Sequence, residues 1–158
     1  MFTVEQVILI RRAPAEVFAF LADHANDPLW RSDLIATRRT SSGTAGVGET
    51  FQATVKFLGR QTSEYRVVVY DPDRCEEFEA ISGPLRTSRI SATLSDAAKG
   101  TTLRYRLDVR LNGPFRLAAP VMPRLFQKQL GEFLSTLKSV LETRSDSETT
   151  PENSHSRE

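Results

Sequence analysis

The sequence predicts an α+β fold in which a curved antiparallel sheet of about six or seven strands wraps around one long C-terminal helix, with two short helices after the first strand. Apolar residues recur at three- and four-residue spacing from Phe126 to Leu141, which is typical of a helix with one wide apolar face. Segments of alternating apolar and polar residues precede this helix. Only a sheet built from them offers a surface large enough to bury that face, and such a curved sheet often leaves a cavity beside the helix.

Length and composition are those of one globular domain. The chain has 158 residues, of which 39% are hydrophobic and 26% charged, enough for a core that folds alone. A formal net charge of +1 gives no electrostatic reason to expect a nucleic-acid partner. The single cysteine, Cys75, fits a reducing compartment, and Val7–Ile10 is too short for a signal peptide or a membrane span. We therefore expect a cytoplasmic protein without a membrane span.

The first third of the chain predicts one strand and two short helices. Thr3–Arg11 is rich in valine and isoleucine, as strands are. A helix starts at Ala13–Glu16, because proline suits a first helical turn and glutamate suits the positive end of the helix dipole. Asp23–Asp27 predicts a cap and turn, and Pro28–Arg31 a second short helical turn.

Alternating apolar side chains predict the remaining strands. These strands include Phe51–Phe57, Tyr65–Val69, Phe78–Ala80, Ile90–Leu94 and Leu103–Leu111, and a further strand with only a weak pattern is predicted over Asp33–Arg39. Three glycines in Ser41–Gly48 predict a mobile loop. Leu58–Gly59 and Asp71–Asp73 are typical of tight turns between strands.

The last part of the chain predicts the long helix and a tail. Asn112–Pro114 breaks the sheet, and Pro120 and Pro123 each remove a helical hydrogen bond. We therefore expect a break or kink, followed by a regular helix over Pro123–Glu142. Residues 143–158 lack large apolar side chains, which predicts a disordered tail after a domain of residues 1–142.

Several local motifs occur in an order that resembles a known family. Val7–Ile10 followed by Ala13–Asp23 is similar to an opening strand and a P-x-E-V-F helix, and Asn26–Trp30 to an N-x-P-x-W turn. Further similar elements are Gly46–Phe51, Leu58–Arg60, Tyr70–Arg74, Gly100–Leu103 and Leu137–Glu142. Together they resemble the START-like helix-grip superfamily (SRPBCC), and within it the polyketide cyclase/dehydrase and lipid-transport group. The likeness covers Phe2–Glu142.

This resemblance implies a deep pocket between sheet and helix, in a group whose members bind lipids, hormones or polyketides. Some members cyclise or dehydrate polyketides, some carry hydrophobic ligands, and some regulate partner proteins. The matching motifs are structural turns and helix starts, so no catalytic residue of the family maps onto this sequence. The fold therefore implies a pocket without choosing one activity.

Aromatic and apolar side chains on the predicted inward faces are the candidate ligand-binding residues. They are Trp30, Phe51, Phe57, Tyr65, Phe78, Tyr105, Met122 and Phe126. Such a lining is typical of small-molecule sites. Trp30 is either a rim aromatic that stacks on a flat ligand or, as we favour, a core anchor. Met122 is the most attractive single candidate, because a flexible thioether adapts to different ligands.

Polar side chains give weaker indications. For His24, the only histidine of the predicted domain, we expect a solvated or capping role, with a carboxylate–imidazole pair to Asp23 or Asp27 as the alternative. Arg86 facing inward would indicate an anionic ligand, but its place near a strand start favours an exposed side chain. Neither a metal-ligand spacing nor a phosphate-binding glycine loop is present, so we expect no metal and no cofactor.

Three functions follow, in order of preference. The first is binding of a small hydrophobic or aromatic molecule in the cavity. The second is a cyclase or dehydratase in the same pocket, with Tyr105, Tyr65 or His24 as proton donor or acceptor, which requires at least two converging polar groups. The third is a protein-interaction module that acts through the sheet or Ser41–Gly48. An open sheet has unpaired edges, so both a monomer and a homodimer are compatible with the sequence.

Overall fold

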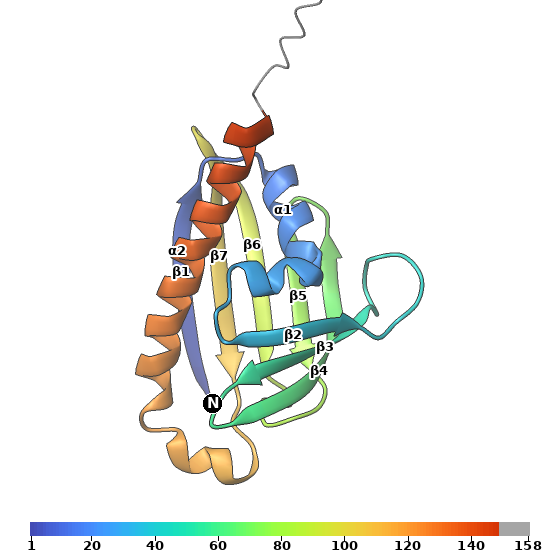
Figure 1. The fold of residues 1–158 in the computed structure, drawn as a ribbon. Coiled ribbons are helices and arrows are strands. Elements are labelled where there is room, and N and C mark those ends of the chain that lie inside the picture. Colours follow the sequence, from blue (N-terminus) through green and yellow to red (C-terminus); the bar gives the residue numbers. More distant parts are fainter. Residues whose placement is uncertain (149–158) are drawn as a thin grey trace, which may run out of the picture.

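The computed structural model describes residues 1–148 and confirms the predicted fold. One antiparallel sheet of seven strands, in the order β1-β7-β6-β5-β4-β3-β2, curves around the C-terminal helix (Figure 1). The strands are β1 (Phe2–Ile10), β2 (Leu34–Arg39), β3 (Thr50–Lys56), β4 (Arg60–Asp71), β5 (Cys75–Ala80), β6 (Arg89–Ala97) and β7 (Gly100–Val109). The helices are α1 (Pro14–Ala22), the 3-10 helices η1 (His24–Leu29) and η2 (Gly113–Ala118), and α2 (Met122–Glu148).

Side-chain alternation produces the inner face of the sheet. On β7, Leu103 and Tyr105 are buried, whereas Arg104 and Arg106, which alternate with them, are exposed, because successive strand residues point to opposite faces. Helix α2 buries a stripe with helical spacing against this face, formed by Leu130, Leu134, Leu137 and Leu141. The inward side chains of the strands and the apolar stripe of α2 therefore form one core, as their periodicities predict.

Polar contacts fix α2 alongside β1. Near its start, the Gln127 side chain donates a hydrogen bond to the Glu5 carbonyl at 3.1 Å. Further along the helix, the Arg11 amide donates to the Glu142 carboxylate at 2.9 Å, and the Arg12 guanidinium donates to backbone carbonyls of the helix. The helix is therefore anchored on the β1 edge of the sheet, and the opposite edge, β2, is covered by η1 (Figure 1).

Two predicted features of the C-terminal region have different outcomes. The expected break is confirmed, because η2 is separate from α2 and Pro120 lies between them. The expected helix end at Glu142 is wrong, since α2 continues to Glu148. Extending an anchored helix adds a hydrogen bond for each ordered residue, whereas starting one requires a costly first turn. The rest of the predicted tail lies outside the described residues. None of the helices within residues 1–148 is long and apolar enough to cross a membrane.

Candidate ligand-binding cavity

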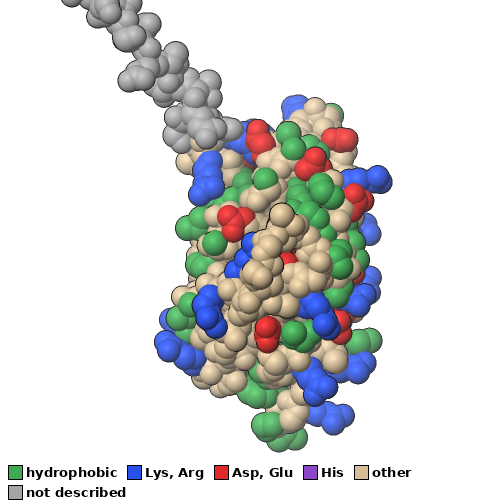
Figure 2. Space-filling model, turned by 90° about the vertical axis from the view of Figure 1, so that its right-hand side faces the viewer, with side chains coloured by type: hydrophobic (Ala, Val, Ile, Leu, Met, Phe, Trp, Pro, Cys, Tyr) green, Lys and Arg blue, Asp and Glu red, His purple; other side chains and the backbone are tan. Residues whose placement is uncertain are grey.

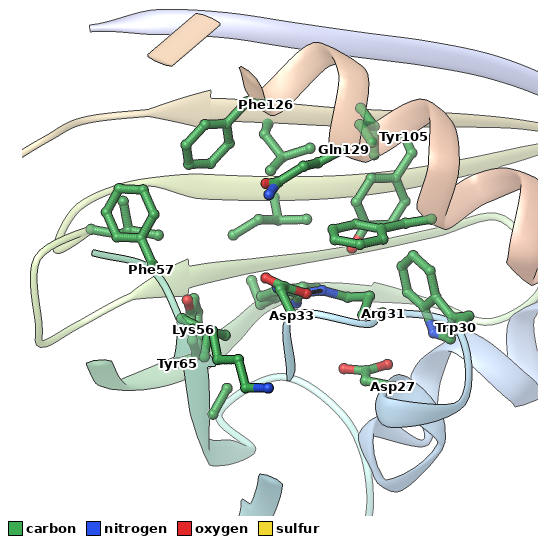
Figure 3. A pocket seen from close by; sticks show the side chains of 18 of the residues that line it. Asp27, Trp30, Arg31, Asp33, Lys56, Phe57, Tyr65, Tyr105, Phe126 and Gln129 are labelled. Atoms are coloured by element: carbon green, nitrogen blue, oxygen red, sulfur yellow. Dashed lines mark hydrogen bonds and ion pairs between the residues drawn. The ribbon is translucent and has the colours of Figure 1, made fainter. Parts of the chain in front are cut away.

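A cavity of about 80 Å³ lies between the inner face of the sheet, α2 and the segment that joins η1 to β2 (Figure 3). Its apolar and aromatic lining consists of Trp30, Phe51, Ala53, Val55, Phe57, Tyr65, Phe78, Leu85, Ile90, Tyr105, Leu107, Phe126, Leu130 and Phe133. Its polar lining consists of Asp27, Arg31, Asp33, Lys56 and Gln129. This predominance of apolar groups with a few polar ones is the usual make-up of a small-molecule site.

The cavity has a buried end and a more accessible end. Trp30 and Asp27 lie at one end in Figure 3 and are both buried. Phe57 and Phe126 lie at the other end, where both rings are half-buried and Lys56 is exposed. The cavity is therefore closest to solvent beside Phe57 and Phe126.

The structure brings together seven of the eight predicted site residues around this cavity, all except Met122. Met122, the first residue of α2, is buried in a separate cluster with Val109 and Leu111. The proposed ligand contact of Met122 is therefore not supported by its position. The expected exposure of Arg86 is confirmed.

Ring contacts hold the buried end of the cavity in shape. Phe51 stacks on Tyr65 with 5.4 Å between ring centroids and meets Phe78 edge-on at the same distance. Trp30, which is 3% exposed, meets Tyr105 edge-on at 5.7 Å. Such pairs contribute about 0.5–1.5 kcal/mol each beyond area burial. Trp30 is thus a core anchor, as favoured above, and it also lines the cavity.

A partly exposed ion pair, formed by Arg31 and Asp33, lies in the cavity wall. The Arg31 guanidinium donates two hydrogen bonds to the Asp33 carboxylate, at 3.0 and 3.3 Å, and lies over the Phe133 ring at 5.9 Å from its centroid (Figure 3). Sequence reasoning missed both residues, since they lie in a short irregular segment without periodicity.

Two tyrosine hydroxyls in the lining stay protonated at neutral pH. Burial raises the pKa of both Tyr65 and Tyr105, and the nearby positive charge of Arg31 only partly opposes this shift. Among the described residues, none forms a hydrogen bond with the Tyr105 hydroxyl. Tyr105 therefore offers a neutral hydroxyl to a ligand.

The structure corrects the expectation for His24. Its side chain is buried, and its two ring nitrogens lie 3.0 Å from carboxylate oxygens of Asp27 and Glu76. The ring also stacks on Phe51 at 3.9 Å between centroids. The alternative of a carboxylate–imidazole pair is correct for Asp27 only, because Asp23 instead accepts a hydrogen bond from the Ala25 amide at the start of η1. Glu76 was not foreseen as a partner.

The two carboxylates of this cluster keep the His24 ring protonated, as an imidazolium between them. Burial by itself lowers the pKa of His24, but the hydrogen bonds and charges of Asp27 and Glu76 outweigh it and raise the pKa to about 10. His24 does not line the cavity, whereas its partner Asp27 does. The cluster therefore holds the Asp27 carboxylate in the cavity wall, and His24 is poorly suited to proton transfer near neutral pH.

The cluster of His24, Asp27 and Glu76 should make the stability of the folded protein depend on pH. Because the pKa of His24 is raised in the folded state from its ordinary value of 6.5 to about 10, folding binds a proton. The contribution of the cluster is complete below pH 6.5 and is lost as the pH rises through 10. We expect the urea midpoint to fall over this interval, as measured by circular dichroism, and the slope to be reduced in His24→Gln. Equal slopes in both proteins would contradict this.

The fold and the site together define a helix-grip protein with a small aromatic cavity between its sheet and its C-terminal helix. Residues 1–142 match the family model described as polyketide cyclase / dehydrase and lipid transport, and the chain belongs to this family. The comparison with curated proteins found no match.

Solved structures share the fold at low sequence identity. TTHA0849 from Thermus thermophilus is similar with a TM-score of 0.78 and 14% identity, over 91% of this chain and 99% of the other. The di-domain ARO/CYC StfQ of the steffimycin biosynthetic pathway has a TM-score of 0.74 and 13% identity, over 91% of this chain and 51% of StfQ. A START superfamily protein from Mycobacterium smegmatis has a TM-score of 0.69 and 16% identity, over 93% and 99%.

Proposed function

We propose that this protein binds a small, flat, mainly apolar molecule with a hydrogen-bonding oxygen in the cavity between the sheet and α2. The observation that carries the proposal is the aromatic lining of the cavity, here called the aromatic wall. It combines ring faces with the Tyr105 hydroxyl, which has no hydrogen-bond partner among the described residues. Ring faces favour flat apolar groups, and a buried hydroxyl gains a partner when a ligand oxygen accepts its hydrogen bond. The family description, polyketide cyclase / dehydrase and lipid transport, supports this ligand class.

The cavity volume indicates the size of ligand that fits without rearrangement. A cavity of about 80 Å³ is smaller than the roughly 300–1,000 Å³ of sites for drug-sized ligands. This conformation therefore suits a single ring. A two-ring ligand such as 2-naphthol binds only when the half-buried rings of Phe57 and Phe126 at the accessible end move.

Native mass spectrometry of gently purified protein tests this proposal, with extraction of any bound compound. We expect a mass above that of the chain alone, and an apolar or phenolic compound in the extract. If the purified protein is empty, phenol, which has a single ring, and 2-naphthol, which has two, should each form a saturable one-to-one complex when added at increasing concentration. The proposal is overturned if no compound is retained and neither phenol nor 2-naphthol forms a complex.

A second candidate function, cyclisation or dehydration of a polyketide-like substrate, is favoured by the polar groups that line the same cavity. Tyr105, Tyr65, Arg31 and Asp27 meet the requirement for at least two converging polar groups. A neutral tyrosine can donate a hydrogen bond to a substrate carbonyl and stabilise the negative charge that develops on its oxygen. The likeness of this chain to the ARO/CYC protein StfQ, at 13% identity, is a likeness of fold alone.

The variant Tyr105→Phe separates the two functions, because it removes the hydroxyl and keeps the ring. A suitable probe is a single-ring β-hydroxy ketone, whose loss of water to the conjugated enone is followed by ultraviolet absorbance. Dehydration by the wild type that falls about 100-fold or more in the variant, with 2-naphthol binding retained, would support catalysis. Absence of dehydration in the wild type would leave binding alone.

A further inference from the structure

One end of the molecule, here called the tip, consists of residues 56–60, 81–88 and 110–125. These segments are joined by contacts: the Phe57 ring stacks on Phe115 at 5.6 Å, and the Asn112 amide donates to the Pro84 carbonyl at 3.1 Å. The tip contains the β3–β4 turn and η2, which lie together at the lower end of Figure 1. It adjoins the accessible end of the cavity, because Phe57 and Phe126 line the cavity and also pack on each other at 5.8 Å.

Large aliphatic side chains protrude from the tip into solvent. Leu117 is 88% exposed, Val121 63% and Leu58 61%. Figure 2 shows hydrophobic side chains at the lower end of the molecule, with lysine and arginine side chains beside them. Exposed large aliphatic residues that gather at one end are unusual for a surface that meets only water.

The charged side chains of the tip all have one sign. They are Lys56, Arg60, Arg86, Arg110, Arg116 and Arg124, and each of them is exposed. The three segments that form the tip contain no aspartate or glutamate. Each of the six lacks an ion pair among the described residues, whereas other basic residues, such as Arg89 with Glu77 and Arg104 with Glu5, have acidic partners. The net charge of the whole chain is only +1, so the tip concentrates positive charge at one end.

We propose that the tip docks on an anionic lipid bilayer, with Leu58, Leu117 and Val121 inserted between the headgroups and the surrounding cations facing anionic lipids. Basic residues around exposed aliphatic side chains are the combination that binds such an interface. A nucleic acid needs the cations and not the aliphatic groups, so those three side chains favour a bilayer. Docking there places the accessible end of the cavity next to the bilayer. The inference does not depend on ligand binding.

Co-sedimentation with lipid vesicles tests this proposal. We expect the protein to bind vesicles that contain phosphatidylserine, and to bind pure phosphatidylcholine vesicles far more weakly. Each cation near an anionic surface strengthens partitioning about fivefold, so Arg116→Gln with Arg124→Gln should weaken it about 30-fold. Leu117→Ser should also weaken it, by about tenfold, because its inserted methylene groups are lost. None of these residues lines the cavity, and all are exposed, so the fold should be retained.

The matched control removes two exposed cations elsewhere. Arg66 on β4 and Lys99 in the β6–β7 turn are exposed and have no ion pair among the described residues, so Arg66→Gln with Lys99→Gln makes the same change in net charge. Vesicle binding by the control variant should weaken by less than about fivefold, which is the effect expected from the loss of one cation at the bilayer surface. The proposal is overturned if the wild type does not bind phosphatidylserine vesicles, or if control and tip variants lose binding equally. It is also overturned if the protein prefers duplex DNA to these vesicles and Leu117→Ser has no effect.

Discussion

Replacing His24 with glutamine should lower the free energy of unfolding by about 3–5 kcal/mol. The substitution removes the positive charge that lies 3.0 Å from both Asp27 and Glu76 and leaves two buried carboxylates facing each other without it. An uncompensated buried charge costs far more than a lost surface contact. Urea denaturation at pH 6.5, where the cluster contributes fully, measures the effect.

A matched control distinguishes the buried cluster from an ordinary ion pair. Arg89 pairs with Glu77 at 3.6 Å on the neighbouring strands, but its side chain is 49% exposed. Arg89→Gln should therefore cost about 1 kcal/mol or less. Adding Asp27→Asn and Glu76→Gln to His24→Gln should recover most of the lost stability, because no buried charge remains. A loss below about 1 kcal/mol for His24→Gln alone would show that the cluster is not a strong electrostatic contact.

Replacing Ala53 with phenylalanine should abolish tight binding of 2-naphthol while the protein stays folded. Ala53 is buried on β3 and lines the cavity, so a ring at this position occupies the space of the ligand. A ligand ring denied this burial loses about 1.5–3 kcal/mol, which is roughly a 10- to 100-fold loss of affinity. Quenching of Trp30 fluorescence by 2-naphthol measures the affinity directly, since the only tryptophan of the chain lines the cavity.

The control for this variant is Met122→Leu. Met122 is buried in the cluster with Val109 and Leu111 and does not line the cavity, so a volume-conserving exchange should leave affinity unchanged. If Ala53→Phe melts normally and still binds as tightly as the wild type, the ligand lies elsewhere. If Met122→Leu weakens binding as much as Ala53→Phe, the boundary of the site is wrong.

The fold was predictable because its main determinants are periodic. The alternation on β7 and the stripe from Leu130 to Leu141 each assign side chains to a face, and one sheet gripping one helix is the arrangement that buries both. The aromatic wall followed from the same periodicity. Met122 was misplaced because it lies just after a break at Pro120, where no regular period extends to it.

The polar part of the site was less predictable, for a physical reason. Arg31 and Asp33 lie between elements, so only the three-dimensional path of the chain brings them to the cavity. Glu76 did carry a signal, since it shares the inward face of β5 with Phe78 and Ala80. A carboxylate on a buried face needs a positively charged partner. His24, the only histidine of the predicted domain, could therefore have been proposed as the partner of Glu76.

The central claim, that the cavity is the ligand site, is tested most directly by two-dimensional NMR during titration of the wild-type protein with 2-naphthol. We predict saturable shifts of the Trp30 indole N–H and of the backbone amides of Ala53 and Tyr105, with the amide of Lys99 in the β6–β7 turn unchanged. Absence of shifts at Trp30 and Tyr105, or shifts confined to surface residues, would contradict the account.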